Sequence, residues 1–571
     1  MPKTIVEILR ERSIHQGQRL AYRFLTDGES DEVCLSYEGL DRRARAISAM
    51  LRSAGKPGDR ALVLLPPGLD FVAAYFGCLY SQFIAIPVNS PHRFRMDRAS
   101  SRLSGIAADA TPSLGLTTSS LFLAIKEQGT PSPELRNIRW LVVDRPDVDS
   151  LADNWIPTEI DVEDIAFLQY TSGSTTEPKG VVVSHANIMH NLTLSEKCFG
   201  LSSESQAVIW LPPYHDMGLI GGILQPLRNG FPVTLMSPAM FLQRPFRWLQ
   251  SMSRFRATIS GAPNFAYDLC FRKIKPEQRE ALDLRNWDVA FNGAEPVNHK
   301  TVETFSSYFA PCGFRPEAFT ACYGLAEATL MVSGGLKRER PLVREFRTSS
   351  LVQNHVEPAV GVEGDAQTLV SSGNAIGGQE IKIVDAETLE ICDVNEVGEI
   401  WVRGPSVASG YWNKPSESDH TFRACLATTN EGPFLRTGDL GFLLEGELFV
   451  TGRLKDLIII DGNNHYPQDI EKTVENSHPA IRPAGCAAFS ANKGVGEYLV
   501  VIAEVENRFL TETDEIINSI RRSVAEHHDL SVQDIRLVRA GEIAKTTSGK
   551  IRRFVVRQNY LSGTREEIPQ Q

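Results

Sequence analysis

Short apolar runs alternate with segments of helical apolar spacing along most of the chain. Runs that predict buried strands lie at residues 61–65, 83–88, 114–118, 140–143, 165–170, 181–183, 208–211, 233–236, 257–260 and 289–292. Apolar residues at helical spacing predict helices at residues 5–14, 217–227, 246–255 and 297–309. Strands that alternate with helices are typical of a largely parallel, layered α/β fold.

The pattern changes twice in the last third of the chain. Residues 335–374 open with a basic run, turn polar and show little periodicity, which predicts an insertion, a lid or a mobile loop. Residues 380–384, 398–403 and 448–451 then alternate like antiparallel strands and predict a small β-barrel-like part. From residue 455 onwards the signals predict a compact α+β unit. We therefore expect a large N-terminal domain of residues 1–454 and a small C-terminal domain of residues 455–571.

Length and composition indicate a globular protein and give no sign of a nucleic-acid partner. A chain of 571 residues should form several domains, and 42% hydrophobic with 23% charged residues is ordinary for a globular protein. The net charge of −11 gives no reason to expect binding to nucleic acid. Nine cysteines without a C-x-x-C motif argue against a disulfide framework and favour a cytoplasmic location.

One uncharged segment raises the question of a membrane span. Residues 71–89 carry no charge over about the length of a spanning helix. The segment contains Gly77, Gln82, Pro87 and Asn89, however, and its second half has the pattern of a strand. We expect a helix followed by a buried strand, and no membrane span.

The loop between the apolar runs at residues 165–170 and 181–183 is dense in hydroxyls and glycine. Residues 171–177 read Thr-Ser-Gly-Ser-Thr-Thr-Glu and are followed by Pro178, Lys179 and Gly180. Backbone N–H groups, hydroxyls and one ammonium between two strands suit a polyphosphate. The loop is not a Walker A loop, because there the lysine directly follows a glycine. A plain surface turn is the alternative, but the flanking strands favour nucleotide binding.

Further polar motifs follow the predicted strands. They are Tyr214-His215-Asp216, Asn292-Gly293-Ala294-Glu295 and Tyr323-Gly324-Leu325-Ala326-Glu327. In parallel sheets, ligands bind where the carboxyl ends of the strands meet. We therefore expect these motifs and the loop at residues 171–180 to converge on one site.

Seven motifs in this order resemble those of the adenylate-forming superfamily of acyl-CoA synthetases, luciferases and peptide-synthetase adenylation domains. They are the segment 170–180, the three motifs above, Thr437-Gly438-Asp439, the segment 452–456 and the segment 545–550. The chain is most similar to the fatty acyl-AMP ligases. Residues 210–222 and 464–471 carry this closer resemblance, together with the long polar stretch where these ligases have an insertion, within residues 335–374.

The resemblance implies a two-step reaction that uses ATP and Mg²⁺. A fatty acid carboxylate attacks the α-phosphorus of ATP and gives acyl-AMP and pyrophosphate. Two anions must meet in this step, so catalysis is mostly positioning and charge neutralisation. The acyl group then passes to the phosphopantetheine thiol of an acyl carrier protein. Asp149-Ser150-Leu151 resembles a phosphopantetheine attachment site but has no four-helix unit around it, so the carrier is expected to be a separate protein.

The resemblance also implies roles for single residues. Lys550, His215 and Lys179 are the expected catalytic residues; Lys550 reaches into the main site from a mobile C-terminal domain. The residues expected to bind ATP or AMP are Thr171, Ser172, Gly173, Ser174, Thr175, Gly293, Ala294, Glu295, Tyr323, Gly324, Asp439 and Arg453. Glu327 is the expected ligand of Mg²⁺, which prefers carboxylate, water and phosphate oxygens. Lys455 marks the expected hinge between the domains.

Within the expected nucleotide site, three residues are expected to contact different parts of the nucleotide. Tyr323 offers a flat face to adenine. Asp439 can accept hydrogen bonds from both ribose hydroxyls, and Arg453 can contact the ribose or a phosphate with its planar fork.

Two other functions stay open on the sequence alone. An acyl-CoA ligase would hand the same intermediate to coenzyme A, and in the ligases resembled here the insertion hinders the rearrangement that CoA transfer requires. A non-catalytic nucleotide-binding or regulatory module is the second alternative. Retention of Lys179, Glu327, Asp439 and Lys550 together argues against that module.

Overall fold

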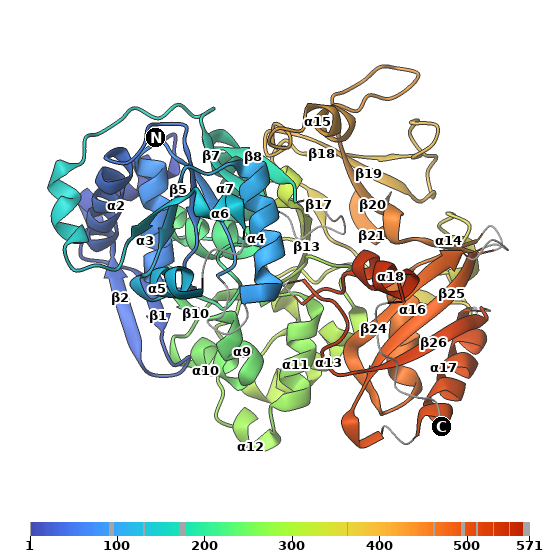
Figure 1. The fold of residues 1–571 in the computed structure, drawn as a ribbon. Coiled ribbons are helices and arrows are strands. Elements are labelled where there is room, and N and C mark those ends of the chain that lie inside the picture. Colours follow the sequence, from blue (N-terminus) through green and yellow to red (C-terminus); the bar gives the residue numbers. More distant parts are fainter. Residues whose placement is uncertain are drawn as a thin grey trace.

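The computed structural model places two layered α/β parts, a small antiparallel sheet and a C-terminal α+β unit side by side (Figure 1). It describes residues 2–90, 96–128, 132–170, 178–361, 364–460, 463–492, 497–509, 512–528, 530–546 and 549–563. The predicted α/β class, with a large N-terminal and a small C-terminal domain, is confirmed.

The first sheet is mostly parallel and has the strand order β6-β5-β3-β4-β7-β8. Its strands are β3 Arg60–Val63, β4 Ile84–Pro87, β5 Leu114–Thr117, β6 Arg139–Val142, β7 Ile165–Tyr170 and β8 Gly180–Ser184. The helices of this part are α2 Tyr37–Arg52, α3 Leu69–Tyr80, α4 Met96–Ala110, α5 Ser119–Gln128 and α6 Pro133–Arg136, with a 3₁₀ helix at Val148–Asn154. Strands β7 and β8 are antiparallel, with Tyr170 opposite Gly180, so Lys179 lies at the end of this hairpin.

The second sheet has the order β17-β14-β13-β12-β11-β9-β10-β1-β2 and is parallel at its centre. Its strands are β1 Leu20–Leu25, β2 Glu32–Ser36, β9 Ala207–Ile209, β10 Val233–Met236, β11 Ile259–Ala262, β12 Val289–Asn292, β13 Phe319–Gly324, β14 Met331–Gly334 and β17 Asn374–Ala375. Its helices are α1 Ile5–Gln16, α7 His185–Phe199, α8 Gln225–Asn229, α9 Pro238–Gln243, α10 Phe246–Arg254, α11 Asn264–Lys273, α12 Pro276–Arg279 and α13 His299–Phe309, with 3₁₀ turns at Ala310–Cys312, Pro316–Ala318 and Ala326–Ala328.

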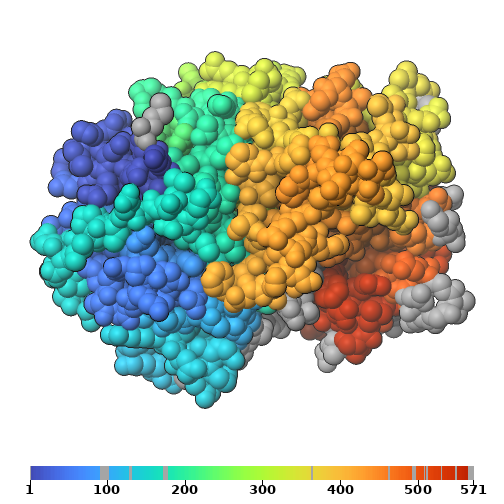
Figure 2. Space-filling view, turned by 90° about the horizontal axis from the view of Figure 1, so that it is seen from above, coloured from blue at the N-terminus to red at the C-terminus, as the bar shows by residue number. Residues whose placement is uncertain are grey.

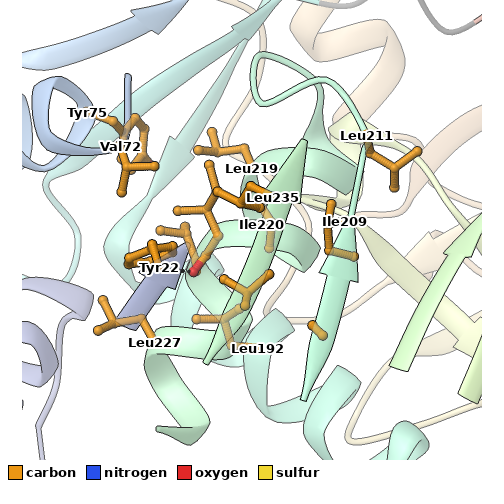
Figure 3. Close-up of a cluster of buried hydrophobic side chains, with 14 of the residues drawn as sticks. Tyr22, Val72, Tyr75, Leu192, Ile209, Leu211, Leu219, Ile220, Leu227 and Leu235 are labelled. Carbon is orange, nitrogen blue, oxygen red and sulfur yellow. Dashed lines mark hydrogen bonds between the residues drawn. The ribbon is translucent and has the colours of Figure 1, made fainter. Parts of the chain in front are cut away.

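A continuous apolar core joins the two sheets through helices that lie between them. Figure 3 shows side chains from β1, α3, α7, β9 and β10 meeting around Ile220. The Tyr22 hydroxyl donates to the Ile223 carbonyl oxygen at 2.8 Å, which satisfies its only polar atom inside the core. The core therefore fixes the strand ends from which the polar motifs project.

Helix α7 starts immediately after β8, and a capping box sets that start. The Ser184 side chain accepts from the Asn187 N–H at 3.2 Å, and Asn187 Oδ1 accepts from the Ser184 N–H at 3.0 Å. Reciprocal bonds of this kind satisfy two helix-end donors.

The small antiparallel sheet has the order β18-β19-β20-β21. Its strands are β18 Glu380–Val384, β19 Gly398–Arg403, β20 Leu435–Leu444 and β21 Glu447–Arg453, with helix α15 at Pro415–Phe422. In Figure 2 this golden-orange part lies between the blue and teal N-terminal half and the red C-terminal elements. The small sheet therefore connects the N-terminal α/β parts with the C-terminal unit.

The C-terminal unit follows a 3₁₀ turn at Leu454–Asp456. Its elements are β22 Ile458–Ile460, β23 Asn463–His465, α16 Pro467–Ser477, β24 Ile481–Asn492, β25 Glu497–Val505, a 3₁₀ turn at Asn507–Phe509, α17 Thr513–His528, β26 Val532–Arg539 and α18 Arg553–Leu561. Its strands and helices enclose a hydrophobic core of their own, formed by residues such as Ile458, Val474 and Ile520.

Residues 335–374, predicted to be an insertion, a lid or a mobile loop, contain regular secondary structure in their described part. They contain β15 Val343–Phe346, α14 Thr348–Leu351 and β16 Gln367–Val370, with β15 and β16 paired. Phe346 packs edge-on against Phe442 and Phe449 of the small sheet, at ring centroid distances of 5.1 and 5.6 Å. The few apolar residues that anchor the segment are too widely spaced to give a periodic signal.

The predicted helix at residues 217–227 is also not a regular α-helix. Met217–Leu224 forms a π-helical segment that leads into α8. A Cβ on Gly218 would overlap the Pro212 carbonyl oxygen. Glycine at this position therefore allows the backbone to pass close to Pro212 where the wider π-helical turn begins.

The uncharged segment at residues 71–89 forms most of α3 and then β4, as expected. Within the described parts of the chain, no helix is both long enough and apolar enough to cross a membrane.

Candidate active site

The carboxyl ends of the central strands open into one cavity of about 1920 Å³ beside the C-terminal unit. The predicted site residues that line it are Lys179, His215, Ala294, Glu295, Tyr323, Gly324, Glu327, Asp439, Arg453, Lys455 and Lys550. Gly293 directly precedes this lining at the end of β12. Thr171, Ser172, Gly173, Ser174 and Thr175 lie outside the described residues. The structure thus brings the described motifs together at one site.

Asp439 is the centre of a hydrogen-bonded trio in the cavity wall. The Tyr323 hydroxyl donates to Asp439 Oδ2 and Arg453 Nε donates to Oδ1, both at 2.8 Å. Strands β20 and β21 place Asp439 opposite Arg453. Burial, together with Asp439, raises the pKa of Tyr323, and the Asp439 carboxylate raises the pKa of Arg453. Tyr323 is therefore neutral and Arg453 charged, while Asp439 keeps further lone pairs for a ligand hydroxyl.

Backbone forms the wall next to this trio. A Cβ on Gly324 would overlap the Leu330 carbonyl oxygen, and one on Gly293 would lie 2.7 Å from the Cys322 carbonyl oxygen. The next residue, Ala294, has a φ of +75°, in a region that non-glycine residues seldom occupy. Backbone strain of this kind clusters at ligand sites.

Glu327 and Lys179 both contact Tyr411, Glu327 at the hydroxyl and Lys179 at the face of the ring. The Tyr411 hydroxyl donates to Glu327 Oε1 at 2.9 Å, and Lys179 Nζ lies 5.0 Å from the centroid of the Tyr411 ring. Lys179 also forms an ion pair with Glu417 of α15. Burial raises the pKa of Glu327, although the hydrogen bond from Tyr411 and the charge of Arg453 oppose this.

Lys550 closes a tight turn between Lys545 and α18, which we call the Lys550 turn. The Thr546 N–H donates to the Lys550 carbonyl oxygen at 2.7 Å, and the Lys550 N–H donates to Thr546 Oγ1 at 3.0 Å. The turn approaches the N-terminal domain at Gly549, where a Cβ would lie 3.4 Å from the Phe265 ring. Thr546, Gly549 and Lys550 of this turn line the cavity.

Charges from both domains meet around the Lys550 ammonium. Burial, and next Arg453, lowers the pKa of Lys550, whereas Glu295, Asp216 and Asp439 oppose this. Burial in turn raises the pKa of Glu295, although its carboxylate accepts from the Asn264 N–H at 2.9 Å. Lys550 is thus a desolvated cation whose protonated form the nearby carboxylates favour, and its positive charge can stabilise an anion that reaches it.

His215 stands in a position where burial keeps it neutral. Burial, with contributions from Arg102 and Lys550, lowers the pKa of His215 to about 3. The neighbouring Asp216 accepts from the Met217 N–H at 2.7 Å at the start of the π-helical segment. At neutral pH His215 can therefore act by hydrogen bonding, and it carries no charge.

Lys455 is exposed in the 3₁₀ turn between the two domains, beside Asp456. Arg553 Nη1 donates to Asp456 Oδ2 at 3.2 Å, and Nε and Nη2 donate to Glu471 at 2.7 and 2.6 Å. The Arg553 guanidinium thus holds the start of α18 against Asp456 and Glu471. The Lys550 turn, which directly precedes α18, is held with it.

Sequence reasoning missed Tyr411 and Glu417. Both follow β19 in a segment without a recognisable nucleotide-binding motif. They reach Lys179 because the Trp412 N–H donates to the Gly180 carbonyl oxygen at 2.8 Å, and the Val182 N–H donates to the Gly410 carbonyl oxygen at 3.0 Å. Only this long-range pairing reveals them.

Comparisons with known proteins agree with this arrangement. The model of the AMP-binding enzyme family matches residues 9–412, and that of the AMP domain of Disco-interacting protein 2-like proteins matches residues 455–570. The medium-chain-fatty-acid–[acyl-carrier-protein] ligase JamA of Moorena producens is 45% identical, over 99% of this chain and 96% of its own. FadD21 of Mycobacterium tuberculosis, provisionally named a fatty-acid–CoA ligase, is 38% identical over 98% of each chain.

One solved structure combines the same fold with bound ligands. It is the fatty acyl-adenylate ligase of Legionella pneumophila in complex with acyl adenylate and pyrophosphate. The two chains are 41% identical with a TM-score of 0.77, over 100% of this chain and 98% of that one.

Proposed function

This chain belongs to the AMP-binding enzyme family, and from that premise we propose that it activates a fatty acid with ATP. The products of the first step are acyl-AMP and pyrophosphate, and the acyl group then passes to the phosphopantetheine thiol of a separate acyl carrier protein. The observation that supports this most is the Lys550 turn, which lies in the same cavity as the Asp439, Tyr323 and Arg453 trio.

In the first step, a carboxylate oxygen forms a bond to the α-phosphorus of ATP while the bond to pyrophosphate breaks. Asp439 accepts the ribose hydroxyls, and Tyr323 lies against the adenine. Lys550 neutralises charge that develops between the carboxylate and the α-phosphate, and neutral His215 orients the acyl carboxylate. Lys179 holds the departing phosphates. Preorganised cations in a desolvated site stabilise this transition state more than they would in water.

The donor set fits Mg²⁺ at Glu327. This side chain lines the cavity and offers hard carboxylate oxygens, one of which accepts from Tyr411. Burial raises the pKa of Glu327, and a bound cation would favour its charged form. When bound, Mg²⁺ would neutralise phosphate charge beside this carboxylate.

The division into residues 1–454 and 455–571, with its hinge at Lys455, is also part of the proposal. The position of the exposed Lys455 between two separate hydrophobic cores supports it. We place the protein in the cytoplasm, where the nine free cysteines would remain reduced.

The test of the first step is exchange of labelled pyrophosphate into ATP. We expect exchange that depends on a fatty acid and on Mg²⁺. Exchange that proceeds equally without any fatty acid, or with an amino acid in its place, would contradict the proposal.

Coenzyme A is the rival acceptor, and three hydrogen bonds between residues 335–374 and the C-terminal unit argue against it. The Asn464 N–H donates to the Val352 carbonyl oxygen at 3.0 Å, and Asn464 Nδ2 donates to Asn354 Oδ1 at 3.1 Å. Gln367 Nε2 donates to Asp469 Oδ2 at 2.9 Å. These bonds restrain the C-terminal unit in the orientation that seats Lys550, which opposes the rotation expected for CoA transfer.

Removing two of these bonds should therefore increase CoA transfer. We expect the double variant Gln367→Ala, Asn464→Ala to form acyl-CoA about thirtyfold faster, since the two lost bonds together remove roughly 2 kcal/mol of restraint. Its rate of acyl-AMP formation should change less than threefold. Gln353→Ala, an exposed residue of the same segment, is the control. An unchanged acyl-CoA rate in the double variant would show that these bonds do not select the acceptor.

A further inference from the structure

The ion pair between Lys179 and Glu417 places an anion of the protein on the lysine proposed to hold phosphate. Lys179 comes from the end of the β7–β8 hairpin and Glu417 from α15, so the contact joins segments far apart in the chain. The side chains are 25% and 40% exposed, respectively. Lys179 also faces the Tyr411 ring at 5.0 Å. Its ammonium is thus held from two sides.

Helix α15, which carries Glu417, packs against Tyr411 of the site. The Tyr411 N–H donates to Ser418 Oγ at 2.9 Å, and the Tyr411 ring packs edge-on against Phe422 at 5.0 Å. Because the Tyr411 hydroxyl also contacts Glu327, one side chain links α15 to the proposed phosphate and metal residues. These contacts of Tyr411 therefore fix the position of α15, and with it that of Glu417, relative to Lys179.

The other charges near Glu417 are also basic. Lys414 Nζ lies 3.9 Å from Glu417 Oε1 and 3.7 Å from Asp109 Oδ1. The contact with Lys179, with Lys414 and Lys455 contributing, holds the pKa of Glu417 below its ordinary value. Glu417 is therefore a negatively charged carboxylate at neutral pH.

We propose that Glu417 is a positioning residue that holds Lys179 while no polyphosphate is bound and competes with pyrophosphate for its ammonium. The proposal rests on the phosphate-binding role of Lys179 in the proposed function. A carboxylate and a phosphate oxygen use the same N–H donors. Glu417 keeps its negative charge beside the phosphates once they occupy Lys179, so it weakens their binding. The consequence is easier release of pyrophosphate after the first step.

A stabilising role alone does not account for the pair. Ion pairs that are partly exposed contribute little to folding stability. Asp419 offers a matched comparison, because it lies on the same helix and pairs with Arg423 at 2.7 Å on the exposed surface. Neutralising Asp419 removes a helix ion pair without touching Lys179.

The experiment measures pyrophosphate binding to the whole protein by calorimetry, in the presence of Mg²⁺. For Glu417→Gln we expect the Kd for pyrophosphate to fall about three- to fivefold, which is the size of a partly exposed ion pair. The KM for ATP should fall by a similar factor, with no rise in kcat. Asp419→Asn should leave both constants unchanged, and Glu417→Asp should restore values near those of the original protein.

Weaker or unchanged pyrophosphate binding by Glu417→Gln would overturn the proposal. The thermal midpoints of Glu417→Gln and Asp419→Asn should agree within a few degrees, which separates competition from a loss of fold. Tighter pyrophosphate binding in a protein without fatty-acid-dependent exchange would support the competition and reject the proposed function. Normal exchange with an unchanged Kd would reject the competition alone.

Discussion

Replacing Lys550 with alanine should lower the rate of acyl-AMP formation by about a hundredfold or more. Lys550 is a desolvated cation that lines the same cavity as Glu295, Asp216 and Asp439, whose charges oppose the fall in its pKa. Its charge is most needed where the carboxylate meets the α-phosphate, so the loss should appear mainly in kcat. Pyrophosphate release, followed in single-turnover mixing, measures the effect.

Lys545→Ala is the matched control for this prediction. Lys545 lies on the same turn, is exposed, and its Nζ is 3.8 Å from Glu504 of its own domain. We expect a rate of acyl-AMP formation within about threefold of the original protein. A Lys550→Ala variant that retains the full rate would refute the role of Lys550.

The pH dependence of the same step gives a second readout. Because burial lowers the pKa of Lys550, the ammonium is present below that pKa and lost as pH rises through it. The value of kcat/KM should therefore fall on the alkaline side. Lys550→Arg keeps its charge at all accessible pH values, so its alkaline fall should be absent even if its absolute rate is lower.

Replacing Asp439 with alanine should lower kcat/KM for ATP by about a hundredfold. The change removes the acceptor for the ribose hydroxyls and leaves Arg453 and the buried Tyr323 hydroxyl without their shared partner. Losing hydrogen bonds to a charged group costs roughly 1.5–3 kcal/mol each, and about 2.8 kcal/mol corresponds to a hundredfold.

Comparing ATP with 2′,3′-dideoxy-ATP isolates the ribose contact. The original protein should prefer ATP strongly, and Asp439→Ala should lose most of this preference. An Asp439→Ala variant that still discriminates fully between the two nucleotides would place the ribose elsewhere.

Short apolar runs with polar boundaries could be predicted closely from the sequence. The strands at Ile165–Tyr170, Val233–Met236 and Val289–Asn292 begin and end where the runs do, because burial of both sheet faces leaves little choice of residue. Features that depend on distant contacts could not be predicted. The π-helical turn needs Gly218 against Pro212, and the order of residues 335–374 needs Phe346 against the small sheet.

The same distinction applies to the site. The motifs after β12 and β13 converge as expected, because parallel strands end at one edge. Tyr411 and Glu417 reach Lys179 through pairing between segments that the sequence does not connect. The neutral state of His215 likewise follows from burial, which a single residue in a motif does not reveal.

Mass spectrometry of the product is the most direct test of carrier-directed activation. The reaction contains the full chain, ATP, Mg²⁺, a medium-chain fatty acid and excess CoA. We predict that acyl-AMP accumulates and that little acyl-CoA forms. Abundant acyl-CoA would contradict this account and identify coenzyme A as the acceptor.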